Sequence, residues 1–155
     1  MIGLLQRVTS ASVEVGGERV AQIGTGLLVL VGVERDDNAA RAQRLLARLL
    51  GYRVFEDAEG RMNRSVADIQ GGLLLVPQFT LAADTRRGSR PGFSTAAPPG
   101  MARTLFAELL DQARQHHPEL GADALVARDV HRAAVGGHDR LRARLCSPDA
   151  LRGVR

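Results

Sequence analysis

Two continuous apolar runs constrain the fold of this chain more than any other feature. Residues 26–33 read GLLVLVGV, and residues 71–76 read GGLLLV. Successive side chains of a strand point to opposite faces, so an uninterrupted apolar run predicts a strand that is buried on both faces. We therefore expect two buried strands, the second of which extends over residues 71–81 and contains the sequence PQFT at residues 77–80.

The segments around these runs predict further strands and loops. Residues 4–15 are rich in β-branched side chains, and Gly16-Gly17 predicts a turn into a returning strand over residues 19–24. Residues 52–66 predict a short strand and a loop, and residues 82–100 predict a longer loop because they are rich in Gly, Pro and Ser.

Two segments predict amphipathic helices. Apolar residues recur at three- and four-residue spacing over residues 39–50 and 101–117. Asp37 or Asn38 can cap the start of the first helix, and Gly51 can end it. The apolar face of the second helix consists of Leu105, Phe106, Leu109 and Leu110.

Length and composition predict one soluble domain. The chain has 155 residues, strands dominate its first half and two helices accompany them, so we predict a single α+β domain over residues 1–155. Arg7 interrupts the first apolar run, and no stretch reaches the roughly 18–20 apolar residues of a membrane helix. We therefore expect a cytoplasmic protein with no membrane partner. The single cysteine, Cys146, fits a reducing compartment.

The net charge of +4 arises entirely in the last part of the chain. Residues 1–127 carry 14 arginines and 14 acidic residues, whereas residues 128–155 carry seven arginines and three aspartates. A basic surplus can bind a polyanion such as RNA. Alternatively, these arginines are a solvated tail from an arginine-rich proteome.

The sequence lacks the common motifs of side-chain catalysis. It has no CxxC, HExxH, phosphate-binding glycine loop or GxSxG sequence. Its histidines all lie in the last quarter of the chain, at His116, His117, His131 and His138, and the first two are expected on the surface of a helix end. Catalysis by this chain would therefore depend on backbone donors and on groups of the substrate.

Residues 77–80 offer such donors. Pro77 has no N–H and is expected to stop the strand ladder, so that the N–H groups of Phe79 and Thr80 point away from the strand. One backbone donor to an oxyanion is worth about 3–4 kcal/mol, and Gln78 adds an amide that both donates and accepts. The alternative is an ordinary strand end whose polar groups bond locally.

Four long blocks resemble the D-aminoacyl-tRNA deacylase family in order and spacing. They are QRVTSASV (6–13), GLLVLVGVERDD (26–37), LGYRVFEDAEGRMNRSV (50–66) and QFTLAADTRRGSRPGFSTAAPP (78–99). The resemblance implies a β-barrel-like sheet core with helices outside it, a homodimer, and no metal or cofactor. It implies hydrolysis of the ester that joins a D-amino acid, or mischarged glycine, to the 3′ end of tRNA.

The resemblance also assigns the site. The family's pocket motif Ser-Gln-Phe-Thr is matched by Gln78, Phe79 and Thr80, with Pro77 in place of the serine, and these residues would bind the aminoacyl group and terminal adenosine. Thr80 is the nucleophile in one account, and backbone donors with the RNA 2′-hydroxyl act in the other. We favour the second, because no base near Thr80 is evident. The arginines expected to meet tRNA phosphates, unless they form a solvated turn, are Arg86, Arg87 and Arg90.

The family's chiral selector is absent from this sequence. In the family, a cis Gly-Pro peptide near the C-terminus enters the partner subunit's pocket and excludes L-amino acids. Arg7 matches a position that helps to hold this selector, or is simply a surface arginine. Here Gly137 and His138 stand at about the selector's place, and a non-proline cis bond costs about 3–4 kcal/mol. From about residue 116 the chain has either diverged or been read in a shifted frame.

Three hypotheses follow. The first is a D-aminoacyl-tRNA deacylase, which is the main prediction. The second is a catalytically impaired homologue that still binds tRNA 3′ ends. The third is an esterase without chiral selectivity, which would also hydrolyse L-aminoacyl-tRNA.

Overall fold

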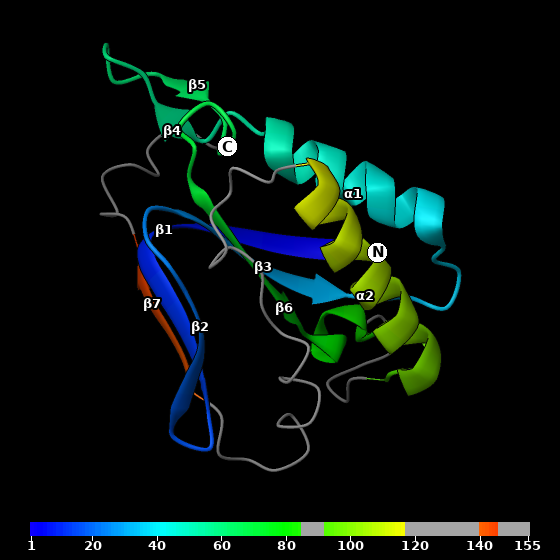
Figure 1. Ribbon diagram of the computed structural model, residues 1–155. Coiled ribbons are helices and arrows are strands. Elements are labelled where there is room, and N and C mark those ends of the chain that lie inside the picture. The colour runs from blue at the N-terminus through cyan, green and yellow to red at the C-terminus, as the bar shows by residue number, and fades with distance from the viewer. Residues whose placement is uncertain (85–91, 117–139, 146–155) are drawn as a thin grey trace.

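One curled sheet and two helices form most of the structure. The computed structural model describes residues 1–84, 92–116 and 140–145. Five strands make the main sheet, and a separate two-stranded sheet lies at its edge (Figure 1). The strands are β1 (Ile2–Val15), β2 (Glu18–Ile23), β3 (Gly26–Gly32), β4 (Phe55–Glu56), β5 (Met62–Arg64), β6 (Gly72–Pro77) and β7 (Arg140–Leu145). The helices are α1 (Ala39–Gly51), the short 3₁₀ helix η1 (Phe79–Ala82) and α2 (Pro99–His116).

β1 pairs antiparallel with β2 along its second half and with β3 along its first half. Both pairings follow one register, from Ala11–Ile23 to Ile2–Gly32, although two residues separate β2 from β3. The predicted turn at Gly16-Gly17 is confirmed, with φ of 59° and 89°, since a tight hairpin needs left-handed backbone conformations. β7 pairs with the second half of β1 on the opposite edge from β2. The sheet therefore curls around the second half of β1.

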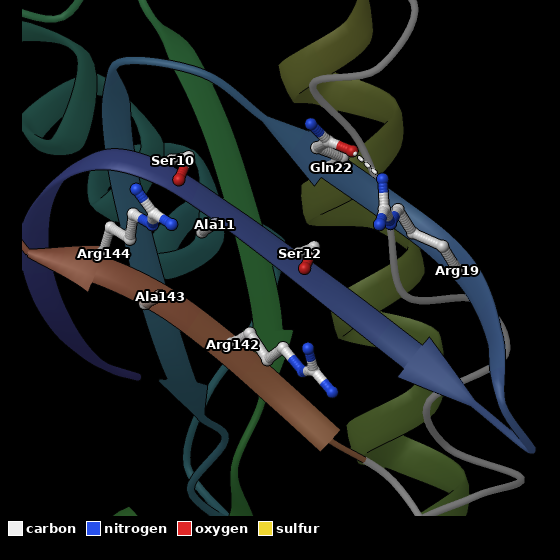
Figure 2. A pocket seen from close by; sticks show the side chains of 8 residues that line it. All are labelled: Ser10, Ala11, Ser12, Arg19, Gln22, Arg142, Ala143 and Arg144. Carbon is white, nitrogen blue, oxygen red and sulfur yellow. Dashed lines mark hydrogen bonds between the residues drawn. The ribbon is translucent and has the colours of Figure 1, made fainter.

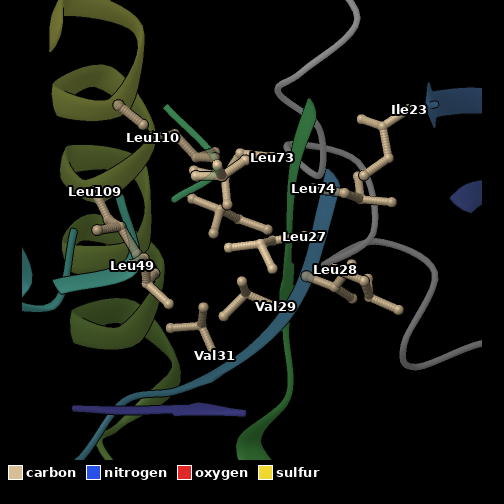
Figure 3. Packing of buried hydrophobic residues seen from close by; sticks show 14 of the residues in the cluster. Ile23, Leu27, Leu28, Val29, Val31, Leu49, Leu73, Leu74, Leu109 and Leu110 are labelled. Carbon is tan, nitrogen blue, oxygen red and sulfur yellow. The ribbon is translucent and has the colours of Figure 1, made fainter. Parts of the chain in front are cut away.

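β3 is the central strand of the core. β1 pairs with one of its edges and β6 runs parallel along the other. Figure 3 shows Val29 on the same side as Leu49 and Leu109 of the helices, and Leu28 on the opposite side. All four of these side chains are buried, which confirms that residues 26–33 contain a strand buried on both faces.

Two neighbouring side chains, Asp37 and Asn38, fix the start of α1 in different ways. Asn38 is the cap, because its side chain accepts the N–H of Arg41 at 3.0 Å. Asp37, the other predicted cap, is buried. It binds the ammonium group of Met1, the N–H of Glu34 at 2.7 Å and the guanidinium of Arg41 at 3.3 Å. Asp37 therefore ties the N-terminal residue, directly before β1, to the start of α1.

The other helix boundaries lie close to the predicted ones. α1 ends at Gly51, as predicted, although the extended residue Tyr52 serves as the cap. α2 begins at Pro99, two residues before the predicted start, because proline suits the first turn of a helix. The predicted apolar face of α2 is buried; it consists of Leu105, Phe106, Leu109 and Leu110.

Two predicted strands differ from the observed elements. The strand predicted over residues 71–81 ends at Pro77, because the carbonyl of Gln78 accepts the N–H of Leu81 and the chain turns into η1. Residues 52–66 contain two short strands, β4 and β5, instead of one. The carboxylate of Asp57 closes the turn between them by accepting the N–H of Arg61 at 2.8 Å. This hydrogen bond also lowers the pKa of Asp57.

The predicted fold class is confirmed: an α+β unit with a curled, barrel-like sheet and two main amphipathic helices. None of the helices in the described ranges is long and apolar enough to cross a membrane. The extent of the domain over residues 1–155 stays a prediction. His117, His131, His138 and Cys146 lie outside the described residues.

We expect Gly26→Ala to lower the free energy of unfolding by about 1–3 kcal/mol or more. A Cβ atom at Gly26 would lie 2.0 Å from the carbonyl oxygen of Gly72, so β3 and β6 would have to separate. Gly24→Ala is the matched control, because nothing lies within 4 Å of its Cβ position. Urea unfolding checks this, and equal midpoints for the two variants would show that the strands do not approach this closely.

Candidate active site

The PQFT segment turns sharply at the end of β6 and crosses the end of β3. The N–H of Gln78 donates to the carbonyl of Val31 at 2.7 Å. In a parallel ladder alternate residues face the same neighbour, so the residue before Gln78 faces the outer edge of β6. β6 is an outer strand of the described sheet, and Pro77 therefore occupies its last rung without the loss of a ladder hydrogen bond.

η1 places two backbone donors at the surface. Phe79 and Thr80 are the first two residues of η1, and the first N–H groups of a helix have no partner within it. Across the part of the chain that the structure describes, no backbone acceptor is found for either N–H. The Phe79 side chain is 61% exposed, and Thr80 is also exposed. The segment is thus an exposed edge with two backbone donors that have no backbone acceptor among the described residues.

The hydroxyl of Thr80 has a local partner. The side-chain amide of Gln78 donates to Thr80 Oγ1. Among the described residues no carboxylate or imidazole bonds to this oxygen, so no base is in place to activate it. The polar side chains of this segment therefore do bond locally, as the alternative of an ordinary strand end predicts. This hydrogen bond does not use the N–H groups of Phe79 and Thr80.

A second segment lies beside η1. The Phe93 ring is 5.3 Å from the Phe79 ring, with 53° between their planes. Thr95 Oγ1 donates to the carbonyl of Ala82, and the N–H of Arg35 donates to the carbonyl of Thr95 at 3.0 Å. Residues 92–97 are thereby held between η1 and the exit of β3.

The residues that flank the arginine-rich segment 85–91 pair with each other. Asp84 and Gly92 form a mutual pair of backbone hydrogen bonds of 2.7 and 2.9 Å. The predicted phosphate-binding arginines lie between this pair in the sequence, in residues 85–91, outside the described ranges. Their role stays a prediction.

Gly32 supports η1 from below, and sequence reasoning did not single it out. A Cβ atom at Gly32 would lie 2.9 Å from the Cβ of Leu81 and 3.3 Å from the carbonyl oxygen of Gln78. η1 can cross the end of β3 at this height only because this residue has no side chain. Phe93 and Thr95 were also not assigned a role, although both lie in the block 78–99 that carried the family resemblance.

Arg7 does not lie beside the PQFT segment of its own chain. It pairs with Leu27, whereas Pro77 lies on the rung of Gly3 and Val31, four residues away along the sheet. At 3.3 Å per residue this separation is about 13 Å.

The side chain of Arg7 is half-buried and points toward the small second sheet. Its Nη1 donates to the carbonyl of Val54 at 2.8 Å and contacts the Sδ of Met62 at 3.3 Å. Its Nη2 is buried and has no hydrogen-bond partner among the residues that the structure describes. Arg7 is therefore no ordinary surface arginine, and its assignment to substrate stays a prediction.

The remaining site predictions fall outside the described residues or concern metals. Gly137 and His138, at the place of the selector, lie in residues 117–139. Within the ranges that the structure describes, no group of three or more His, Cys, Asp or Glu side chains could hold a metal ion.

The chain matches proteins of one family. A family model described as D-Tyr-tRNA(Tyr) deacylase matches residues 4–134. A D-aminoacyl-tRNA deacylase of Stutzerimonas stutzeri (strain A1501) is 63% identical over 120 residues, which are 77% of this chain and 83% of that protein. The family match extends past residue 116 and stops before Gly137.

Two solved structures share the fold. One, described as c-Myc DNA Unwinding Element Binding Protein, superposes with a TM-score of 0.79 at 34% identity and covers 93% of this chain and 91% of its own. The other, a probable eukaryotic D-amino acid tRNA deacylase, superposes with a TM-score of 0.69 at 16% identity and covers 92% of each chain.

The curled sheet and the open PQFT edge thus define an α+β domain of the deacylase fold. Since the family model covers most of the chain and a curated relative is 63% identical to it, the chain belongs to the D-Tyr-tRNA(Tyr) deacylase family.

We expect Gly32→Ala to displace η1 while the rest of the fold is kept. The new methyl group must push against Leu81 and the Gln78 carbonyl, so the N–H groups of Leu81 and Ala83, which close η1, should exchange with solvent about fivefold faster or more. NMR hydrogen exchange measures this, with Gly24→Ala as the control. Unchanged protection of both amides would mean that Gly32 does not support η1.

Proposed function

We propose that this protein hydrolyses the ester bond between a D-amino acid, or mischarged glycine, and the 3′-terminal adenosine of tRNA. The observation that carries the proposal is the open PQFT edge, with its two backbone donors, in a chain of the deacylase family. The named relative is a D-aminoacyl-tRNA deacylase. A cytoplasmic location follows from a substrate that takes part in translation.

Catalysis would use the backbone of η1. Water attacks the ester carbonyl, and the N–H groups of Phe79 and Thr80 hold the oxygen that becomes negative. The bond from the carbonyl carbon to the ribose 3′-oxygen then breaks, the 3′-oxygen takes a proton, and the amino acid leaves as its carboxylic acid. The neighbouring 2′-hydroxyl of the RNA can relay the proton, since none of the described residues places a base beside Thr80 Oγ1.

Side chains around η1 would position the substrate. Gln78 would orient the adenosine through its amide while it holds Thr80. Phe79 and Phe93, 61% and 42% exposed, offer aromatic faces on which an adenine ring can stack. Pro77 sets the direction of the segment, because it ends β6 with a fixed backbone angle.

A homodimer would complete the site. The PQFT segment is an open edge, and an ester is hydrolysed selectively only where something covers the bound amino acid. Leu4, 48% exposed, lies on β1 on the rung of Leu30 and Val76, across β3 from the end of β6, and would offer an apolar contact to a second copy at this end of the sheet. Arg7 would help to hold the C-terminal element that enters the pocket across the dimer, as the family resemblance implies.

The altered C-terminus supports a second candidate function. No Gly-Pro dipeptide occurs in the sequence, so the element that excludes L-amino acids in the family is missing. If the backbone donors still act without this element, the protein would be an esterase that accepts both chiral forms. If turnover is lost together with the element, the protein would be the impaired tRNA-binding homologue instead.

We expect the purified protein to hydrolyse D-Tyr-tRNA well above the uncatalysed rate. D-Tyr-tRNA and L-Tyr-tRNA are incubated with it side by side, and the remaining ester is counted. Hydrolysis of the D-ester alone supports a chirally selective deacylase, and hydrolysis of both supports the non-selective esterase. If folded protein hydrolyses neither ester, the proposed activity is wrong and the impaired homologue stands.

The second activity experiment separates the backbone of Phe79 from its ring. Phe79→Ala removes the ring and keeps the N–H, whereas Phe79→Pro removes both. Proline suits this position, since Phe79 is the first residue of η1 and Gln78 before it is extended, with φ of −141° and ψ of 90°. We expect kcat for D-Tyr-tRNA to be about 100-fold lower in Phe79→Pro than in Phe79→Ala. Equal rates in the two variants would exclude this N–H as the oxyanion donor.

A further inference from the structure

A polar groove crosses the outer face of the sheet where β2, β1 and β7 lie side by side (Figure 2). It has a volume of about 440 Å³. We call it the serine–arginine groove; its polar lining residues are Ser10, Ser12, Arg19, Gln22, Arg142 and Arg144. None of these residues belongs to the PQFT edge or to the arginine-rich segment 85–91.

The register of the three strands builds this groove. Ser10 is paired with Arg144, and Ser12 is paired with Arg142 on one side and Gln22 on the other. Paired residues on neighbouring strands point to the same face. The middle strand therefore supplies a floor of short hydroxyl side chains, and the outer strands supply long side chains as walls. Since neighbouring strands are about 4.8 Å apart, the walls stand about 10 Å apart.

The walls are positively charged. Arg142 and Arg144 are two residues apart, so both point to the same face of β7, about 7 Å from each other along the strand. Arg142 lies 3.6 Å from the carboxylate of Glu14, which offsets one positive charge. Arg19 donates to the side chain of Gln22 at 2.6 Å and keeps its full charge. The three arginines and one glutamate give the groove a net charge of +2.

We propose that the serine–arginine groove binds the ribose-phosphate backbone of tRNA, away from the ester. This inference rests on the deacylase function proposed above. Guanidinium groups bind phosphate oxygens in a fixed fork geometry, and hydroxyl and amide groups can bond both phosphates and ribose 2′-hydroxyls. The floor and walls offer these groups, and the lining contains no aromatic side chain and no apolar side chain larger than alanine, which favours a polar, anionic ligand over a protein partner.

The position of the groove determines which part of the tRNA it meets. Ser10 lies seven residues along β1 from Gly3, which shares a rung with Val31 and Pro77. At 3.3 Å per residue Ser10 is about 23 Å along β1 from Gly3, and Pro77 lies two strand spacings, about 10 Å, to the side, so in a flat sheet the groove would be about 25 Å from the PQFT edge. A DNA strand rises about 3.4 Å per nucleotide and an A-form RNA strand rises less, so this distance corresponds to at least about seven nucleotides. The groove would therefore hold one strand of the acceptor stem and not the terminal adenosine.

Binding of fluorescein-labelled tRNA without an amino acid tests the groove. This ligand reports RNA binding whether or not the protein hydrolyses esters, so failure of the groove and failure of the proposed activity are distinguishable. Fluorescence anisotropy compares Arg144→Gln with Arg44→Gln. Arg44 is an exposed arginine on α1, and its replacement changes the net charge equally.

We expect Arg144→Gln to raise the Kd about 3- to 10-fold and to reduce the slope of log K against log salt by roughly one unit, since one phosphate contact is lost. Arg44→Gln should match the wild type in both quantities. Ser12→Asp, which places a carboxylate on the floor without a change in β7, should weaken binding at least as much as Arg144→Gln. Thermal unfolding checks that each variant is folded.

Equal Kd values for Arg144→Gln and Arg44→Gln would overturn the proposal, because the charge of the whole protein would then account for binding. So would displacement of the tRNA by poly-glutamate at an equal concentration of charges, since the surface would then accept any polyanion. Loss of binding in Arg144→Gln and Ser12→Asp, with Arg44→Gln unaffected and poly-glutamate a weak competitor, supports an RNA site in the groove.

Discussion

The close approach of β6 to β3 is the contact on which the site depends. β3 is enclosed by β1 and β6 at its edges and by side chains on both faces, so it has no freedom to shift. Gly26 and Gly32 stand at its two ends. The first lets β6 pair closely with β3, and the second lets η1 cross over the end of the strand. These two glycines therefore set how closely β6 and η1 approach β3, and with that the position of the PQFT segment.

Most elements of this fold could be predicted from the sequence because their signals are local. The apolar run at 26–33, the Gly16-Gly17 turn and the three- and four-residue spacing in both helices each identify one element. The long-range features had no such signal. The parallel pairing of β3 with β6 and the curl around β1 depend on which strands meet, and the burial of Asp37 depends on the ammonium group of Met1. Neither the amino-acid composition nor the spacing of apolar residues identifies these long-range contacts.

The candidate site was predictable for a different reason. Pro77 and the resemblance both indicated residues 77–80, and the exposed N–H groups of Phe79 and Thr80 follow from a chain that can no longer continue as a strand. The strand predicted to continue to residue 81 is a 3₁₀ helix instead, because the Gln78 carbonyl captures the N–H of Leu81. Gly32 was missed since its role appears only once η1 lies above it.

The proposed catalysis by backbone donors would also explain why a proline can stand where the family resemblance implies a serine. The backbone nitrogen of residue 77 faces the outer edge of β6, where an N–H group would make no ladder hydrogen bond. A proline at this position therefore costs no hydrogen bond to β3. The N–H groups of the next residues do not depend on their side chains. However, backbone donors carry no net charge and contribute little to the capture of a polyanion. Affinity for tRNA would therefore come from charged side chains outside the PQFT segment, and the proposed serine–arginine groove offers such charges on the described surface.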